Sequence, residues 1–229
     1  QNSGYIKLSD LNEANILNLP YSLSTLKSWD TNGDGKLSSS EVSSGITAEA
    51  QNFIGFYNKN NSGSFNVSDV SSVISGNQKL DGGVTAGAFM SEYDLDNSGS
   101  VDLSKILAVR SAQIQTAAPL PSASIILQGA TTDANNKLSI YDKNKKGYIT
   151  LSDVQSAWVA DPTLGDASQA QSSFTSLDLN NDGKVTQNEL ISTNIANNIS
   201  SVISKLLDPS QSGTIKVSNL SQLDLSSLP

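Results

Sequence analysis

The sequence carries a short run of oxygen-bearing side chains that recurs along the chain with a fixed internal spacing. Most copies place Asp, Asn or Ser at positions 1, 3 and 5, glycine at position 6, and an apolar residue at position 8. Copies begin at Asp30, Asn58, Asp94, Asp142, Asp178 and Asp208, and a truncated copy covers Ser3 to Asp10. Carboxylate, amide and hydroxyl oxygens are hard ligands, which suit calcium or magnesium better than zinc or copper. The repeat therefore predicts a series of cation sites.

The composition excludes most competing chemistries. The 229 residues include no cysteine and no histidine, which excludes disulfides, zinc–thiolate sites, cysteine catalysis and histidine general bases. The net charge of −8 argues against nucleic acid and anionic membranes, which need clustered Lys and Arg. The chain has no apolar run long enough for membrane insertion, and no serine lies in a G-x-S-x-G frame. We therefore expect no enzyme, no nucleic-acid binding and no membrane insertion.

Helices are the elements expected to hold these loops. Apolar residues recur at three- and four-residue steps over residues 101–116 and 194–207, which is typical of helices with one buried face. The apolar residues at position 8 should point into the core, where two loops pair through a short antiparallel ladder. These residues are Ile6, Leu37, Phe65, Val101, Ile149, Val185 and Ile215.

A larger duplication indicates two related blocks. Residues 4–10 (GYIKLSD) nearly repeat as 147–153 (GYITLSD), and the loops at Asp30 and Asn58 resemble those at Asp178 and Asp208. Their short separations favour pairing Asp30 with Asn58, and Asp178 with Asp208. We expect block 1 over residues 1–116, with loops at 30–41, 58–69 and 94–105, and block 2 over residues 123–229, with loops at 142–153, 178–189 and 208–219. The proline-containing stretch 117–122 is expected to be a linker, with a tight interdomain turn as the alternative.

With these features the chain resembles the EF-hand superfamily. The resemblance implies an all-α fold of paired EF-hand helix-loop-helix units in two related blocks, and it implies calcium as the bound ion. In an EF-hand loop, oxygens come from the side chains at positions 1, 3 and 5, the carbonyl of position 7 and a carboxylate at position 12. Glycine at position 6 permits a sharp turn that a Cβ would strain.

Two loops match this pattern throughout. For the first, the resemblance implies that the ligands are Asp30, Asn32, Asp34, the carbonyl of Lys36, and Glu41. For the second, it implies Asp178, Asn180, Asp182, the carbonyl of Lys184, and Glu189.

The remaining loops depart from the pattern. The Asp94 loop offers Asp94, Asp96, Ser98, Ser100 and Asp102. Lys105 at position 12 cannot ligate and repels a cation, so we expect weak or altered calcium binding. The Asn58 loop offers Asn58, Asn60, Ser62, Ser64 and Asp69. Only Asp69 is charged, which predicts calcium binding only at millimolar calcium. Lys146 at position 5 of the Asp142 loop, and Lys216 and Asn219 in the Asp208 loop, predict that both loops are ion-free.

The choice between a calcium sensor and a scaffold depends on methionine. Sensors open to expose a methionine-rich groove, whereas this chain has a single methionine, Met90. We therefore expect calcium to stabilise a structural or protein-binding scaffold that is secreted or cell-surface associated, with calcium ions and another protein as partners. A cytoplasmic calcium buffer or sensor is the alternative. Because the chain begins at Gln1 without a signal pattern, we expect a mature chain or an excised fragment.

Overall fold

The computed structural model describes residues 5–8, 11, 16, 19–58, 60–76, 85–114 and 121–207, and helices dominate these ranges. This confirms the predicted all-α class. In chain order the elements are β1 (Tyr5–Lys7), α1 (Leu23–Ser28), β2 (Lys36–Ser38), α2 (Ser39–Tyr57), β3 (Ser64–Asn66), α3 (Val67–Gly76), α4 (Ala86–Tyr93), β4 (Ser100–Asp102), α5 (Leu103–Ala112), α6 (Ala123–Tyr141), β5 (Tyr148–Ile149), α7 (Leu151–Ala160), the 3-10 helix η3 (Ala167–Gln169), α8 (Ala170–Leu177), β6 (Val185–Thr186) and α9 (Gln187–Leu207).

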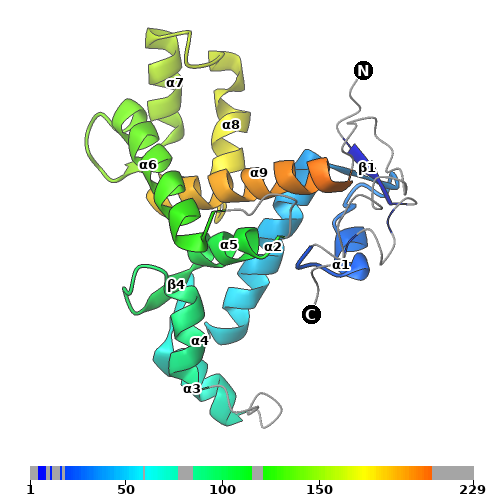
Figure 1. Cartoon of the computed structure of the whole chain (residues 1–229). Helices are drawn as coiled ribbons and strands as arrows, with labels where there is room; N and C mark the ends of the chain where they lie inside the picture. The colour runs from blue at the N-terminus through cyan, green and yellow to red at the C-terminus, as the bar shows by residue number, and fades with distance from the viewer. Residues whose placement is uncertain are drawn as a thin grey trace.

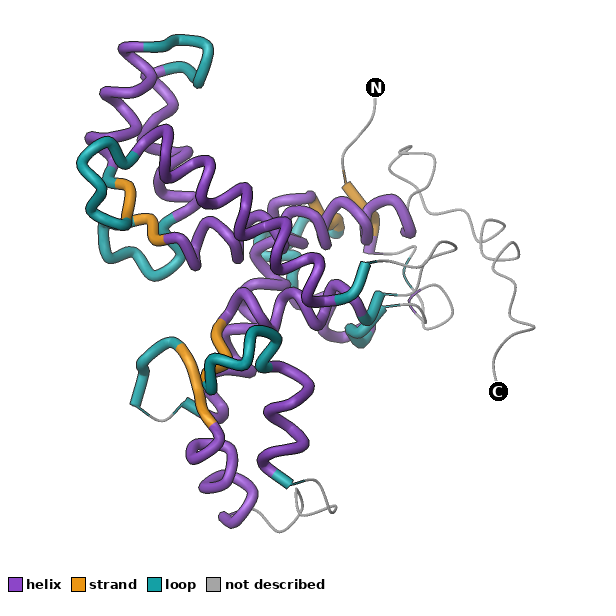
Figure 2. Tube along the Cα trace, turned by 60° about the vertical axis from the view of Figure 1, so that its left-hand side comes forward, coloured by secondary structure: helices purple, strands orange, loops and turns teal. Residues whose placement is uncertain are grey.

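The short strands form separate two-stranded antiparallel ladders, each joining two loops (Figure 2). β1 pairs with β2, β3 pairs with β4, and β5 pairs with β6. The position-8 residues face each other across the ladders and are at most 3% exposed: Ile6 opposite Leu37, Phe65 opposite Val101, and Ile149 opposite Val185. The predicted role of position 8 is confirmed for these residues, and Ile215 lies outside the described residues.

The pairing expected from short separation is wrong. The Asp30 loop pairs with the truncated N-terminal copy, the Asn58 loop pairs with the Asp94 loop, and the Asp178 loop pairs with the Asp142 loop. The reason is that α2, with 19 residues, is a rod of about 28 Å that begins inside the Asp30 loop and ends at Asn58. Two loops at opposite ends of one straight helix cannot form a ladder. The Asp208 loop lies outside the described residues.

The helix starts follow from the same loops, because position 9 caps the helix that leaves the loop. The side chain of Ser38 accepts a hydrogen bond from the backbone N–H of Glu41, and the carboxylate of Glu41 accepts one from the N–H of Ser38. Thr150 and Asp153 form the same reciprocal pair at the start of α7. Such a capping box satisfies two backbone donors that a helix end otherwise leaves unpaired.

The core lies where the long helices cross. Helix α9 packs against α2, α5 and α6, and α2 also contacts α5 (Figure 1). Ile46 of α2 and Ile195, Ile199 and Ile203 of α9 have no exposed surface. Helices from both predicted blocks therefore share one core. The boundary itself stays a prediction, since residues 117–120 lie outside the described residues.

Some predicted helix limits move. Helix α5 ends at Ala112, four residues before the predicted end at residue 116, which is not described, and α9 begins at Gln187, seven residues before the predicted start at residue 194. The loop decides the start of α9, because the helix begins directly at the cap that its own loop supplies. Among the described residues, no helix has the length and apolar character needed to cross a membrane.

Candidate metal centre

The loops share one backbone conformation, which turns the chain sharply at positions 4 and 6. Both position-6 glycines of the two complete loops adopt positive φ, 76° at Gly35 and 79° at Gly183. Position 4 is also left-handed, as Gly33 in the first loop and as Asn181 in the Asp178 loop. Only glycine, and less often asparagine, adopts this conformation without strain, which explains these residue types.

The Asp30 loop folds around its own side-chain oxygens. Asp30 Oδ1 accepts hydrogen bonds from the N–H groups of Gly33 (2.8 Å) and Asp34 (3.2 Å), and Asp30 Oδ2 accepts one from Gly35 (2.9 Å). Asn32 Oδ1 accepts from Asp34 N–H at 2.8 Å, and Asp34 Oδ1 accepts from Lys36 N–H at 2.9 Å. These bonds hold the oxygens at positions 1, 3 and 5 on the inner side of one tight turn.

The Asp178 loop repeats these bonds. Asp178 accepts from the N–H groups of Asp182 (3.1 Å) and Gly183 (2.9 Å). Asn180 Oδ1 accepts from Asp182 N–H at 2.9 Å, and Asp182 Oδ1 accepts from Lys184 N–H at 2.9 Å. Asp178 is more buried than Asp30, since its exposed fraction is 7%. Two segments far apart in the sequence thus present the same oxygens in the same order.

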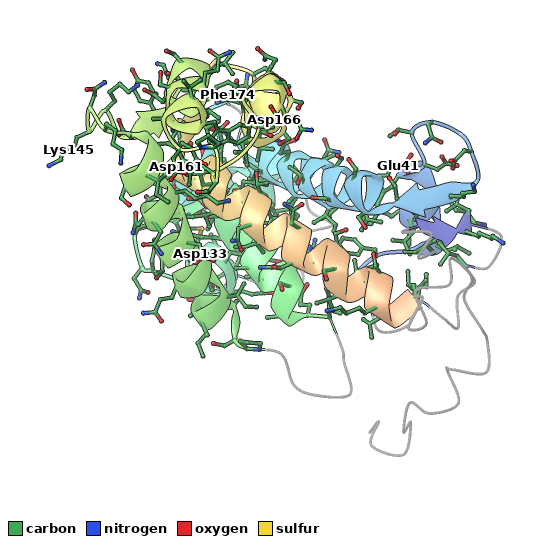
Figure 3. The ribbon with its side chains drawn as sticks, turned by 90° about the horizontal axis from the view of Figure 1, so that it is seen from above. Glu41, Asp133, Lys145, Asp161, Asp166 and Phe174 are labelled. Atoms are coloured by element: carbon green, nitrogen blue, oxygen red, sulfur yellow. The ribbon has the colours of Figure 1, made fainter. Side chains whose placement is uncertain are left out.

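The position-12 glutamates close both loops from the first turn of the following helix. Glu41 Oε2 accepts from Ser38 N–H (2.9 Å) and Ser38 Oγ (2.8 Å), and Glu189 Oε2 accepts from Thr186 N–H and Oγ1, both at 2.8 Å. Glu189 Oε1 also accepts from the N–H of Leu179 at 3.0 Å, at the beginning of its loop. Glu41 lies where α2 leaves the loop (Figure 3).

The surroundings of Glu41 favour its charged form. The backbone hydrogen bond from Ser38 lowers the pKa of Glu41; burial opposes this, and the Ser38 hydroxyl and the N–H groups of Asn32 and Thr31 lower the pKa further. Glu41 and Glu189 are 9% and 8% exposed. Both are therefore buried carboxylates, fixed by hydrogen bonds at the first turn of the helix that leaves each loop.

The donor set fits calcium, although the carboxylates must first move together. Each loop supplies three carboxylates, an asparagine oxygen and a position-7 carbonyl, which is the oxygen set that calcium prefers. Within the described ranges, no three acidic side chains lie close enough to hold an ion as they stand. A carboxylate oxygen has spare lone pairs, so Glu41 and Glu189 can keep their cap bonds while facing an ion.

The Asp94 loop holds a lysine ammonium where the resemblance would place an ion. Lys105 at position 12 donates to Asp94 Oδ1 (3.2 Å), Ser98 Oγ (2.7 Å) and the carbonyl of Ser100 (2.6 Å), and it also contacts the carboxylate of Asp96. Only 3% of Lys105 is exposed. Burial raises the pKa of Asp96, but hydrogen bonds from Lys105 and Ser98 outweigh it and lower the pKa to about 2.

The expected role of Lys105 as a repelling charge is incomplete, because its ammonium lies inside the loop. The available signal was a lysine at position 12 in a loop whose positions 1, 3 and 5 still carry oxygens. Such a loop keeps its ligands while losing the glutamate that completes the site.

The Asn58 loop collects mostly neutral oxygens. Asn58 Oδ1 accepts from Ser62 N–H and from Ser62 Oγ, both at 3.3 Å. Asp69 at position 12 accepts from Asn66 N–H at 2.9 Å. Asn60 Oδ1 accepts from Ser62 N–H at 3.1 Å, and the Ser64 carbonyl accepts from Ser62 Oγ at 2.9 Å. The structure brings together Asn58, Asn60, Ser62 and Ser64, whereas the carboxylate of Asp69 bonds Asn66 at the start of α3.

The Asp142 loop neutralises its own carboxylate. Lys146 Nζ lies 2.6 Å from Asp153 Oδ2, so position 5 donates to position 12. Burial raises the pKa of Asp153, but hydrogen bonds from Lys146 and Thr150 outweigh it and lower the pKa. This arrangement agrees with the expectation that the loop is ion-free, which remains a prediction.

Comparison with known protein families locates the same two loops. The EF-hand family model matches residues 25–44 and residues 171–192, which contain the loops at Asp30 and Asp178. No curated protein matches the chain. The matched segments are helix–loop–helix units with position-8 residues in a ladder and a position-12 glutamate capping the exiting helix. By these matches and this geometry, residues 25–44 and 171–192 are EF-hand units, and the chain is similar to EF-hand calcium-binding proteins at both places.

Proposed function

We propose that calcium binds to the Asp30 and Asp178 loops and stabilises a structural, protein-binding scaffold. The observation that carries this proposal is the position of the two glutamates. Glu41 and Glu189 lie in the first turns of α2 and α9, which are the long helices that pack against each other. An ion held by these glutamates would therefore stabilise the first turns of the two helices that form the core.

The charge balance supports a stabilising role. Each of the two loops gathers three carboxylates, and their mutual repulsion opposes the folded state when no cation is present. Two calcium ions would reduce the formal net charge from −8 to −4. Since the unfolded chain does not hold the ligands together, most of the binding free energy adds to the stability of the fold.

The apolar surface favours a scaffold over a sensor. A sensor needs an adaptable apolar groove that opens with calcium. The single methionine, Met90, is buried, and a groove of about 950 Å³ between α2 and α9 is lined mostly by residues with hydroxyl or amide side chains, such as Ser43, Thr47, Asn197 and Ser201. We propose that the chain is not an enzyme and that its further partner is another protein.

A scaffold that needs calcium suits a compartment where calcium is abundant. We therefore propose a secreted or cell-surface location, where millimolar calcium keeps even modest sites occupied. A cytoplasmic buffer or sensor is the alternative. Fractionating the source cells and detecting the chain by antibody distinguishes the two locations.

The decisive experiment is a calorimetric calcium titration combined with thermal unfolding. We expect two calcium ions per chain. At calcium about 100-fold above Kd each site contributes about 2.7 kcal/mol, so the melting temperature rises by roughly 10–20 °C. Glu41→Gln or Glu189→Gln should each remove one site and about half of this rise.

Glu92→Gln is the matched control, because it makes the same chemical change at an exposed residue of α4 outside the loops. It should leave both sites and the temperature rise intact. Calcium binding without any gain in melting temperature or helix content would refute the scaffold and leave a buffer. No binding at millimolar calcium would refute the proposed function altogether.

A further inference from the structure

The middle pair of loops already contains a cation of its own. The ammonium of Lys105 reaches into the Asp94 loop and donates to oxygens at positions 1, 5 and 7, with the carboxylate of position 3 also in contact. These are four of the positions that supply oxygens to calcium in a complete EF-hand loop. The Lys105 side chain is 4% exposed, so the charge is enclosed by these oxygens rather than by water.

Lys105 can reach the loop because its side chain takes no part in the helix cap. In the complete loops, the position-12 glutamate bonds the N–H of position 9, while position 9 caps the helix. In the Asp94 loop, Asp102 caps α5 without such help and accepts from the N–H of Lys105 at 3.2 Å. An ammonium cannot accept the N–H of position 9 as the glutamates do, and Lys105 donates to the oxygens of the loop instead.

Burial makes this arrangement stable only if the ammonium and the carboxylates stay together. A buried charge without partners is strongly unfavourable, and Asp94 and Asp96 would repel each other without a cation between them. A calcium ion in the same place would have to displace the ammonium. The displaced ammonium would remain on the same short loop, close to a divalent cation that repels it. The two cations are mutually exclusive occupants of one set of oxygens.

We propose that Lys105 is the resident cation of the Asp94 loop, so that this loop is a calcium-independent EF-hand whose oxygen cage accepts calcium once the lysine is replaced by a carboxylate. The native Asp94 loop then binds no calcium, in contrast to the weak or altered binding expected from the sequence. It concerns a loop outside the proposed calcium sites, and it holds whether or not those sites bind.

The rest of the middle unit fits a calcium-independent fold. The partner loop offers a single carboxylate, Asp69. The unit is held by an aromatic core in which Phe89 packs on Phe53, Tyr57 and Tyr93, at ring-centroid distances of 4.9–6.2 Å. The lysine in the Asp142 loop, Lys146, reaches its position-12 carboxylate from position 5 instead. In both loops a lysine of the loop neutralises loop carboxylates, from position 12 in one and from position 5 in the other.

The experiment follows the position-6 glycine amides of the full-length chain by NMR during a calcium titration. In the native chain we expect Gly35 and Gly183 to shift while Gly99 does not. In Lys105→Glu we expect Gly99 to shift as well, and calorimetry should show one additional calcium ion per chain. Lys105→Gln, which offers a neutral oxygen, provides the same comparison if the glutamate variant fails to fold.

A second measurement uses calcium-free protein. Lys105→Met removes the ammonium without adding a ligand and should lower the melting temperature by about 5 °C or more, because two carboxylates lose their buried partner. Lys137→Met, an exposed lysine on α6, is the matched control and should have little effect.

The outcomes separate this inference from the proposed function. A shift of Gly99 in the native chain over the calcium range that shifts Gly35 would overturn the inference. So would a folded Lys105→Glu chain whose Gly99 never responds, or a Lys105→Met chain as stable as Lys137→Met. If the amides of Gly35 and Gly183 do not shift with calcium, that result contradicts the proposed function alone. The comparison of melting temperatures between Lys105→Met and Lys137→Met still decides the role of Lys105.

Discussion

At the scale of single residues, the effect of a lysine in these loops depends on its position. At position 7, Lys36 and Lys184 offer a backbone carbonyl, so the side-chain charge does not enter the ligand set. At position 12, Lys105 places its ammonium among the oxygens, and at position 5, Lys146 pairs with Asp153. A count of charged residues in a loop therefore says little about its ion until each charge has been placed.

The pair of Lys146 and Asp153 predicts a specific pH dependence. The folded-state pKa of Asp153 lies below its ordinary value of 3.8, because hydrogen bonds from Lys146 and Thr150 outweigh burial. A lowered pKa contributes stability that is present above pH 3.8 and is lost as the pH falls through the lowered value. Asp153→Asn should therefore be less stable than the native chain near neutral pH, and the difference should shrink as the pH falls below 3.8.

Chemical denaturation of calcium-free protein at several pH values measures this difference. Lys146→Met keeps the carboxylate but removes the ammonium, so its loss of stability should also shrink in acid. If the difference between native chain and Asp153→Asn were the same at neutral and acid pH, the charge of Asp153 would not be what stabilises the loop.

At the scale of elements, α2 is built to be both the exit helix of one loop and the entry helix of the next. Its start is fixed by the Ser38–Glu41 capping box and its end by Asn58. Along its length, Gly45 allows the ring of Trp29 to lie against the helix backbone. A Cβ at residue 45 would lie 2.2 Å from Cγ of Trp29, whereas a Cβ at residue 55 would meet nothing within 4 Å.

This contrast predicts opposite effects of one substitution on one helix. Gly45→Ala should destabilise the chain by about 1–3 kcal/mol, because the clash with buried Trp29 exceeds the gain in helix propensity. Gly55→Ala should stabilise it by roughly 0.5–1 kcal/mol, because alanine favours the helix and the site is open. Urea denaturation of both variants tests the pair, and stabilisation by both would disprove the packing argument.

At the scale of the whole molecule, the two complete loops meet through the helices that leave them. Helices α2 and α9 cross in the core, and Ser200 Oγ donates to the carbonyl of Ser39 at 2.9 Å while Ser43 Oγ donates to Asn197 Oδ1 at 2.9 Å. The Asp178 loop also lines a cavity of about 530 Å³ together with the Asn58 loop at the far end of α2. We therefore expect that ordering of the Asp178 loop also stabilises α2, the helix that leaves the Asp30 loop, and that the reverse holds for α9.

This connection predicts that the two calcium sites are coupled. Typical coupling free energies of 1–3 kcal/mol correspond to changes of about fivefold or more in affinity. We expect Glu41→Gln, which disables the first loop, to weaken calcium binding at the second loop by about fivefold or more. The midpoint of the Gly183 amide shift in a calcium titration measures this, with Glu92→Gln as control. An unchanged midpoint would mean that the loops act independently despite the packing of α2 on α9.

The local features of this protein follow from its sequence alone. The loop positions, the apolar position-8 residues and the helical class could be predicted, because each depends on residues within a dozen positions of one another. The ligand sets of the Asp30 and Asp178 loops remain predictions. The structure brings their residues into the same arrangement twice.

The pairing of the loops and the contacts of Lys105 depend instead on how the whole chain packs. The expected pairing of Asp30 with Asn58 relied on separation along the chain, whereas a continuous 19-residue helix holds those two loops apart. Likewise, the charge of Lys105 predicted repulsion of an outside ion, but its burial among Asp94, Ser98 and Ser100 makes it a partner of the loop. Both outcomes depend on distances in space that helix rigidity and burial set, and no spacing within a single loop contains them.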